Sequence, residues 1–139
     1  MTKRKKTKTF LVDDHIVVLQ GIRAVLEDST AFEIIGHTTD GLNAVNQVKD
    51  LKPDIVVMDI SMPSFNGIEA TYEIRKSCPS VKIIVYSMSS DKQHVLSLFK
   101  AGISGYVLKE DPLDDLIRAL ETVIRGGTYY SRISRTTHS

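Results

Sequence analysis

Five short apolar runs recur along the chain, and stretches with helical spacing of apolar residues separate them. The runs are rich in Val and Ile, and several are apolar throughout instead of alternating with polar residues. Such runs are typical of strands that are buried on both faces of a parallel sheet. The sequence therefore predicts strands at Thr9–Val12, Glu33–Gly36, Ile55–Met58, Val81–Tyr86 and Tyr106–Leu108.

The segments between these runs predict helices. In the last one, Asp111-Pro112 predicts an N-cap followed by proline at the first helical position, and Gly126-Gly127 predicts the C-cap. The fourth begins after Asp91 and stops at Gly102, and we expect its narrow apolar face to hold it less firmly than the others. The residues at helical spacing are Val18, Leu19, Ile22, Val25 and Leu26; Ala44, Val45 and Val48; the segment Ile68–Ser77; Val95, Leu98 and Phe99; and Leu113, Leu116, Ile117, Leu120, Val123 and Ile124.

Alternating strands and helices with short connections predict one doubly wound α/β domain with right-handed crossovers. The length of 139 residues fits a single domain that needs no disulfides or structural metal ions to fold. The one cysteine, Cys78, excludes an intramolecular disulfide, and no cluster has the spacing of a zinc module. No apolar run approaches the ~20 residues that span a bilayer, so we expect a cytoplasmic protein without membrane contact.

The two ends of the chain differ from its middle. Five of the 18 basic residues lie within residues 1–8, which leaves 13 basic against 17 acidic side chains in the remainder. We expect residues 1–8 to be a flexible solvated tail and not a nucleic-acid contact, because no aromatic residues or further basic stripe accompany it. Residues 9–127 form the predicted domain, and residues 128–139 look like the start of a linker.

Carboxylates follow two of the predicted strands. Asp13 and Asp14 come directly after the first strand, and Asp59 comes directly after the third. Ligands of open parallel sheets bind outside the carboxyl ends of the strands, so these acids should converge on one site. Clustered carboxylates repel one another unless a cation is present, and Mg²⁺, or Mn²⁺ in its place, prefers oxygen ligands of this kind.

A hydroxyl and a lysine lie on the same predicted edge. Ser87 ends the fourth strand and Lys109 ends the fifth. A hydrogen-bond donor and a fixed positive charge are what a phosphoryl group requires opposite a metal ion. Each residue alone has a structural explanation, as a helix cap, a turn residue or a surface charge. Their shared edge favours a site in which a carboxylate attacks phosphorus and forms an acyl phosphate.

The chain resembles the receiver domain of two-component response regulators over about residues 8–127. It resembles most the LuxR/NarL-type branch, judged by the Asp-Asp-His opening, the Ser-Met after the fourth strand and the Gly-Gly-Thr-Tyr-Tyr-Ser exit. The residues that carry the resemblance are Leu11 to His15, Val56 to Pro63 with Asn66-Gly67 behind it, Tyr86 to Met88, and Ala101 to Lys109. The resemblance implies a flavodoxin-like fold with five helices and a five-stranded parallel sheet in the order 2-1-3-4-5.

The resemblance also implies a role for each site residue. Asp59 would accept the phosphoryl group; Asp13, Asp14, Asp59 and the backbone carbonyl of Ser61 would hold the metal ion. Lys109 and Ser87 would contact the phosphoryl oxygens, although receivers more often have Thr than Ser at the position of Ser87. Ser61 and Ser89 would line the approach of the hydrolytic water, and as small polar residues they predict no strong block to autodephosphorylation.

What the site would signal also follows from the resemblance. Ser87 would move toward the phosphoryl group, and the ring of Tyr106 would turn into the space that it leaves. The reporter would be the face made by the fourth helix, the fifth strand and the fifth helix. We expect a sensor histidine kinase as the donor, a homodimer on phosphorylation, and DNA contact only through an output domain of a longer transcription regulator. The chain would be no enzyme beyond its own phosphorylation and dephosphorylation.

Two alternatives stay open at this point. A magnesium-dependent phosphatase with an aspartyl nucleophile would add a cap or substrate pocket, for which 139 residues leave no room. A stand-alone module that binds partners without phosphorylation would need none of this chemistry, whereas every site residue is competent for it. His15 follows the acid pair, and we expect it to be a solvated loop residue and not a metal ligand or phosphohistidine.

Overall fold

A computed structural model describes residues 5–130 of the chain. Residues 1–4 of the expected tail and residues 131–139 of the expected linker lie outside this range. The sheet is parallel, in the order β2-β1-β3-β4-β5-β6. Its strands are β1 (Thr7–Val12), β2 (Phe32–Thr38), β3 (Ile55–Met58), β4 (Lys82–Ser87), β5 (Gly105–Leu108) and β6 (Tyr129–Tyr130). The first five strands confirm the predicted doubly wound order.

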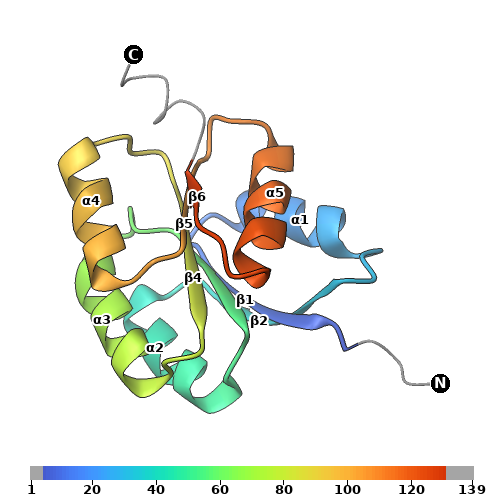
Figure 1. The fold of residues 1–139 in the computed structure, drawn as a ribbon, viewed down its shortest axis with the longest axis horizontal. Coiled ribbons are helices and arrows are strands. Elements are labelled where there is room, and N and C mark those ends of the chain that lie inside the picture. The colour runs from blue at the N-terminus through green and yellow to red at the C-terminus, as the bar shows by residue number, and fades with distance from the viewer. Residues whose placement is uncertain (1–4, 131–139) are drawn as a thin grey trace.

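Helices cover both faces of the sheet (Figure 1). On one face α2, α3 and α4 pack over a cluster that includes Val48, Ile74 and Leu98, and on the other α1 and α5 pack over a cluster that includes Ile22 and Leu116. The described helices are α1 (Ile16–Leu26), α2 (Gly41–Leu51), α3 (Gly67–Ser77), α4 (Lys92–Ala101) and α5 (Leu113–Ile124). No helix within residues 5–130 is long and apolar enough to cross a membrane.

The central strands are buried on both sides, as their apolar runs predict. Along β3, Val56 and Met58 face the α2–α4 side, while Ile55 and Val57 face the α1–α5 side. All four side chains are nearly inaccessible to solvent. At roughly 25 cal/mol per Å² of apolar surface, burial on both faces makes this strand a main source of the sheet's stability.

The sheet includes residues beyond the predicted strands, both before the first strand and after the last helix. β1 begins at Thr7, because its backbone N–H donates to Ala31 O at 2.7 Å. Where we expected the start of a linker, Tyr129 and Tyr130 form the short sixth strand beside β5. Sequence patterns did not predict β6 because two residues are too few to show a strand period.

The ends of α5 follow the prediction in part. The prediction of Asp111 as N-cap is wrong: Pro112 occupies the N-cap with an extended ψ of 145°, and the helix begins at Leu113. At the other end the C-cap is Arg125, and the two glycines predicted to end the helix follow it, with a φ of +92° at Gly126. There Gly126 N donates to Val123 O and Gly127 N donates to Thr122 O, the two bonds of a Schellman motif.

Candidate functional site

Strand register brings the predicted site residues to one edge of the sheet. Val12 pairs with Met58, so the next residues, Asp13 and Asp59, emerge side by side. Ser87 pairs with Leu108, so Lys109 emerges one residue beyond Ser87. Backbone hydrogen bonds continue the ladder past the strand ends, from Asp59 N to Val12 O and from Lys109 N to Ser87 O, each at 2.8 Å. The local backbone therefore fixes where these side chains begin.

The acidic cluster is largely withdrawn from water. The side chains of Asp13 and Asp59 are 4% and 0% exposed, and that of Asp14 is 35% exposed. One oxygen from each of these carboxylates, together with a ring nitrogen of His15, lies within 4.8 Å of the others. Three converging carboxylates match the hard oxygen ligands that Mg²⁺ and Mn²⁺ prefer. The arrangement is compatible with a divalent metal ion.

Lys109 supplies the positive charge of this cluster. Its side chain is 7% exposed, and Nζ lies 2.8 Å from Asp13 Oδ2 and 3.2 Å from Asp59 Oδ2. Both contacts are ion pairs without hydrogen-bond geometry, because neither Lys109 Nζ nor Asp59 Oδ2 has a hydrogen-bond partner among residues 5–130. Asp59 Oδ1, in contrast, accepts the backbone N–H of Ser61 at 3.0 Å. Asp59 thus has one oxygen held by the backbone, while the other is paired only with Lys109 and can accept a further ligand.

The predicted serines form a chain that leads from Asp59 to α4. Ser61 Oγ lies 3.3 Å from Ser87 Oγ, and Ser87 Oγ accepts the backbone N–H of Ser89 at 3.2 Å. The hydroxyl of Tyr106 donates to the backbone carbonyl of Ser89. Two of these three contacts link a site residue to Ser89, in the segment that precedes α4.

Tyr106 lies inside the domain and not on its surface. Its side chain is fully buried in the cluster under α2, α3 and α4. Burial raises the pKa of its hydroxyl above the usual value of 10.0 and outweighs the opposite effect of hydrogen bonding with Ser87 and Ser89. A buried, neutral tyrosine is therefore the stable form in this arrangement.

Two residues at the site were not assigned to it by sequence. His15 Nδ1 lies 3.0 Å from Asp13 Oδ1 and 3.1 Å from Asp14 Oδ1, although its side chain is 60% exposed as expected of a loop residue. Tyr86 lies with its ring centroid 6.0 Å from Lys109 Nζ, and burial raises the pKa of its hydroxyl, with Asp13 adding to the effect. Adjacency to Asp14 was the available signal for His15. Tyr86 gave none, since a strand tyrosine is usually a packing residue.

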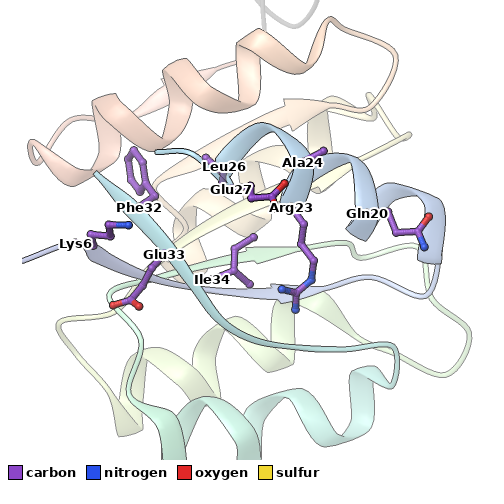
Figure 2. A pocket seen from close by; sticks show the side chains of 9 residues that line it. All are labelled: Lys6, Gln20, Arg23, Ala24, Leu26, Glu27, Phe32, Glu33 and Ile34. Carbon is purple, nitrogen blue, oxygen red and sulfur yellow. The ribbon is translucent and has the colours of Figure 1, made fainter. Parts of the chain in front are cut away.

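A groove elsewhere on the surface belongs to a different part of the fold. It has a volume of about 440 Å³ and lies between α1 and the edge strand β2 (Figure 2). Lys6, Arg23, Glu27 and Glu33 give it charges of both signs. No carboxylate of the acidic cluster lines it. Phe32, the first residue of β2, places the groove toward the amino ends of the strands, whereas the acidic cluster lies at their carboxyl ends. This groove therefore takes no part in the candidate site.

Known proteins resemble the chain over most of its length. The model of the response regulator receiver domain family matches residues 9–121. The transcriptional regulatory protein DegU of Brevibacillus brevis is 40% identical over 124 residues, which cover 89% of this chain and 52% of that protein. The chain thus spans about half the length of this curated relative.

Solved structures give the same result. A two-component response regulator of the LuxR family from Aurantimonas sp. SI85-9A1 is 32% identical, with a TM-score of 0.88 and coverage of 95% of this chain and 94% of that one. The isolated REC domain of RcsB from Salmonella enterica serovar Typhimurium, solved with the phosphomimetic BeF₃⁻, is 27% identical. Its TM-score is 0.87, with coverage of 95% of this chain and 98% of that one.

Proposed function

Because the chain belongs to the family of response regulator receiver domains, of the LuxR/NarL type, we propose that Asp59 accepts a phosphoryl group from the phosphohistidine of a sensor kinase. An oxygen of Asp59 forms a bond to phosphorus while the phosphorus–nitrogen bond breaks, and the electron pair of that bond stays on the imidazole. The observation that carries the proposal is the buried Asp59 Oδ2, which has no hydrogen-bond partner in the described part of the chain and faces Lys109 at 3.2 Å.

Asp13, Asp14, Asp59 and the backbone carbonyl of Ser61 would hold Mg²⁺ or Mn²⁺. The clustered carboxylate oxygens and the unbonded Asp59 Oδ2 support this ligand set. When bound, the cation neutralises charge on the carboxylates and on the incoming phosphoryl oxygens. Because the three carboxylates already lie close together, binding requires little reorganisation of the chain.

Lys109 and Ser87 act on the phosphoryl group from the other side. The ammonium group of Lys109 pairs with one phosphoryl oxygen, and the hydroxyl of Ser87 donates to another. Ser61 and Ser89 line the approach of the water that later attacks phosphorus and releases phosphate, which restores the Asp59 carboxylate. Both side chains are small, so the domain dephosphorylates itself without a strong steric block.

Phosphorylation is reported through Ser87 and Tyr106. The modification adds about −1.5 to −2 charges beside Lys109 and draws the Ser87 hydroxyl toward Asp59. The contact from Tyr106 to Ser89 joins this movement to the face made by α4, β5 and α5. Shifting such an equilibrium from 1:99 to 99:1 requires ~5.5 kcal/mol of differential interaction, of which two or three charge-assisted hydrogen bonds supply a good part.

The whole regulator would control transcription. DegU, whose name describes a transcriptional regulatory protein, is about twice as long as the matched region. The domain would dimerise when phosphorylated and would act on DNA through an output domain, without catalysing a reaction on other substrates. Phosphorylation-independent partner binding is the alternative that the following experiment separates.

The test is the intact mass of the chain after incubation with acetyl phosphate and Mg²⁺. We expect one added phosphoryl group on the wild type, none on Asp59→Ala, and none when the metal is chelated. The exposed carboxylate variant Asp50→Ala serves as the matched control and should be phosphorylated like the wild type. An unmodified wild type, or an equally modified Asp59→Ala, would overturn the proposal.

A further inference from the structure

The short strand β6 has a defined place between α5 and α4. The Schellman motif at Gly126 and Gly127 turns the chain back at the end of α5. Tyr129 N then donates to Ser104 O at 3.0 Å, and Tyr129 and Tyr130 pair in parallel with Gly105 and Tyr106 of β5. In Figure 1, β6 lies beside β5, with α5 to one side and α4 to the other. The chain therefore leaves α5 along the edge of the sheet.

The two tyrosines of β6 pack on opposite faces of the sheet. Tyr129 packs against the cluster under α1 and α5, and Tyr130 packs against the cluster under α2, α3 and α4. The ring of Tyr130 stacks on that of Phe99 in α4, with centroids 5.0 Å apart and planes at 27°. Burial raises the pKa of Tyr130, which agrees with a ring partly withdrawn from water. The stack ties the strand that follows α5 to a different helix.

Phe99 packs against the same cluster but is not among the fully buried residues of α4. The residues that anchor α4 to the domain are Val95, Leu98 and Ala101, all of them buried. Phe99 is only partly buried and turns toward β6. The position of the Phe99 ring thus depends on the position of α4, whereas the position of the Tyr130 ring depends on where β6 lies.

We propose that β6 is a docking strand, and that the Phe99–Tyr130 stack makes its attachment to the sheet depend on the position of α4. This inference rests on the proposed function, in which phosphorylation at Asp59 acts through Ser87 and Tyr106 on the face that includes α4. In the arrangement described here Tyr106 is buried, its hydroxyl meets the carbonyl that precedes α4, and β6 is docked beside it. A phosphoryl group that favours the buried Tyr106 therefore favours docking. The attachment of Tyr129 and Tyr130 to the edge of the sheet is thereby set by the state of Asp59.

The test is hydrogen exchange of individual amides in the full chain. The Tyr129 amide reports docking, since it donates to Ser104 O across the sheet edge. The Gly127 amide is the internal control, because it donates to Thr122 O within the cap of α5. We expect Phe99→Ala and Tyr130→Ala to lower protection of the Tyr129 amide about three- to tenfold and to leave Gly127 unchanged.

Three further variants separate the stack from general effects on α4. Tyr130→Phe keeps an aromatic ring and should restore protection of the Tyr129 amide. Phe99→Leu keeps an apolar side chain without a ring and should lower that protection less than Phe99→Ala does. Leu96→Ala removes an exposed side chain of the same helix and should have no effect. Unchanged protection in both Phe99→Ala and Tyr130→Ala would overturn the proposal.

The second measurement adds beryllofluoride and Mg²⁺ as the phosphoryl mimic. We expect protection of the Tyr129 amide to rise at least threefold in the wild type and not in Phe99→Ala. The amides of Ser61 and Ser89, which donate to Asp59 and Ser87, report the site itself. If they respond while the Tyr129 amide does not, the proposed function stands and the docking inference is overturned. If neither responds, the proposed function fails and the dependence of docking on it fails as well.

Discussion

Lys109 is the residue on which the charge balance of the site depends. Its ammonium group lies among carboxylates whose exposed fractions are 4% and 0%, where water screens little. Removing one partner from a buried ion pair leaves an uncompensated charge, which costs more than the pair contributed. The site therefore carries a stability penalty that a cation can offset.

We predict that Lys109→Met lowers the free energy of unfolding by about 3 kcal/mol in the presence of a chelator. Mg²⁺ should return a good part of this loss, because it supplies positive charge to the same carboxylates. Urea denaturation with and without Mg²⁺ measures both quantities, with the exposed Lys100→Met as the matched control. A loss that is equal with and without Mg²⁺ would contradict the shared site.

Tyr106 makes the stability of the domain sensitive to alkaline pH. Burial raises the pKa of its hydroxyl above the value of 10.0, so the folded state keeps this proton where the unfolded chain has lost it. The contribution of Tyr106 is thus fully present below pH 10 and is lost as the pH rises through the folded-state pKa. We predict that Tyr106→Phe makes the alkaline decline in unfolding free energy shallower. Denaturation between pH 8 and about 11 checks this, and parallel curves for the two proteins would contradict it.

At the scale of elements, helix ends and glycines set how α3 meets the site. Asn66 caps α3, since its Oδ1 accepts the N–H groups of Ile68 and Glu69 at 3.0 and 3.1 Å. A Cβ at Gly67 would lie 2.4 Å from Ile60 Cγ2, next to the proposed acceptor Asp59. The first turn of α3 therefore approaches the loop after β3 so closely that only glycine fits at position 67 without a shift of Ile60.

Two glycine substitutions should act in opposite directions. Gly67→Ala forces Ile60 to shift and should lower the free energy of unfolding by about 1–3 kcal/mol. Gly21→Ala in α1 meets no atom within 4 Å and should raise that free energy by roughly 0.5–1 kcal/mol, since alanine favours a helix interior. Thermal and urea denaturation of both variants test the pair. A higher free energy of unfolding for Gly67→Ala would contradict this prediction, because it would mean that Ile60 can shift without destabilising the domain.

At the scale of the molecule, apolar side chains are exposed beside the face made by α4, β5 and α5. Met88 directly follows β4 and is 64% exposed, and Leu96 lies on α4 and is 55% exposed. Other exposed apolar residues lie on α1, among them Val25 at 45%. Exposed apolar surface of this kind is where a second copy of the chain can pack.

We predict that beryllofluoride with Mg²⁺ shifts the chain from monomer to dimer through the face made by α4, β5 and α5. Leu96→Asp should abolish the dimer because it places a charge in an apolar contact, whereas Val25→Asp on α1 should leave it intact. Sedimentation velocity of the three proteins, with Asp59→Ala as the control for the mimic, measures the effect. A dimer that survives Leu96→Asp and is lost in Val25→Asp would move the interface to α1.

The sequence by itself determined the alternation of strands and helices in one doubly wound domain and the identity of the acidic cluster, whereas the order of the first five strands followed from the family resemblance. Buried parallel strands leave continuous apolar runs, and carboxylates placed directly after them must share one edge of the sheet. Asp13, Asp14, Asp59, Ser87 and Lys109 could therefore be located without coordinates. The roles given to them remain proposals, because a position at the edge does not reveal which group reacts.

Only the tertiary structure decided how β6, the aromatic rings and the loop after β1 are arranged. The pairing of β6 with β5, the stack of Tyr130 on Phe99 and the approach of His15 to Asp13 and Asp14 join residues that follow no sequence period. The start of α5 at Leu113 likewise depended on the extended backbone of Pro112. Periodicity reports which face of an element is buried, whereas contacts between edges and loops arise from packing in three dimensions.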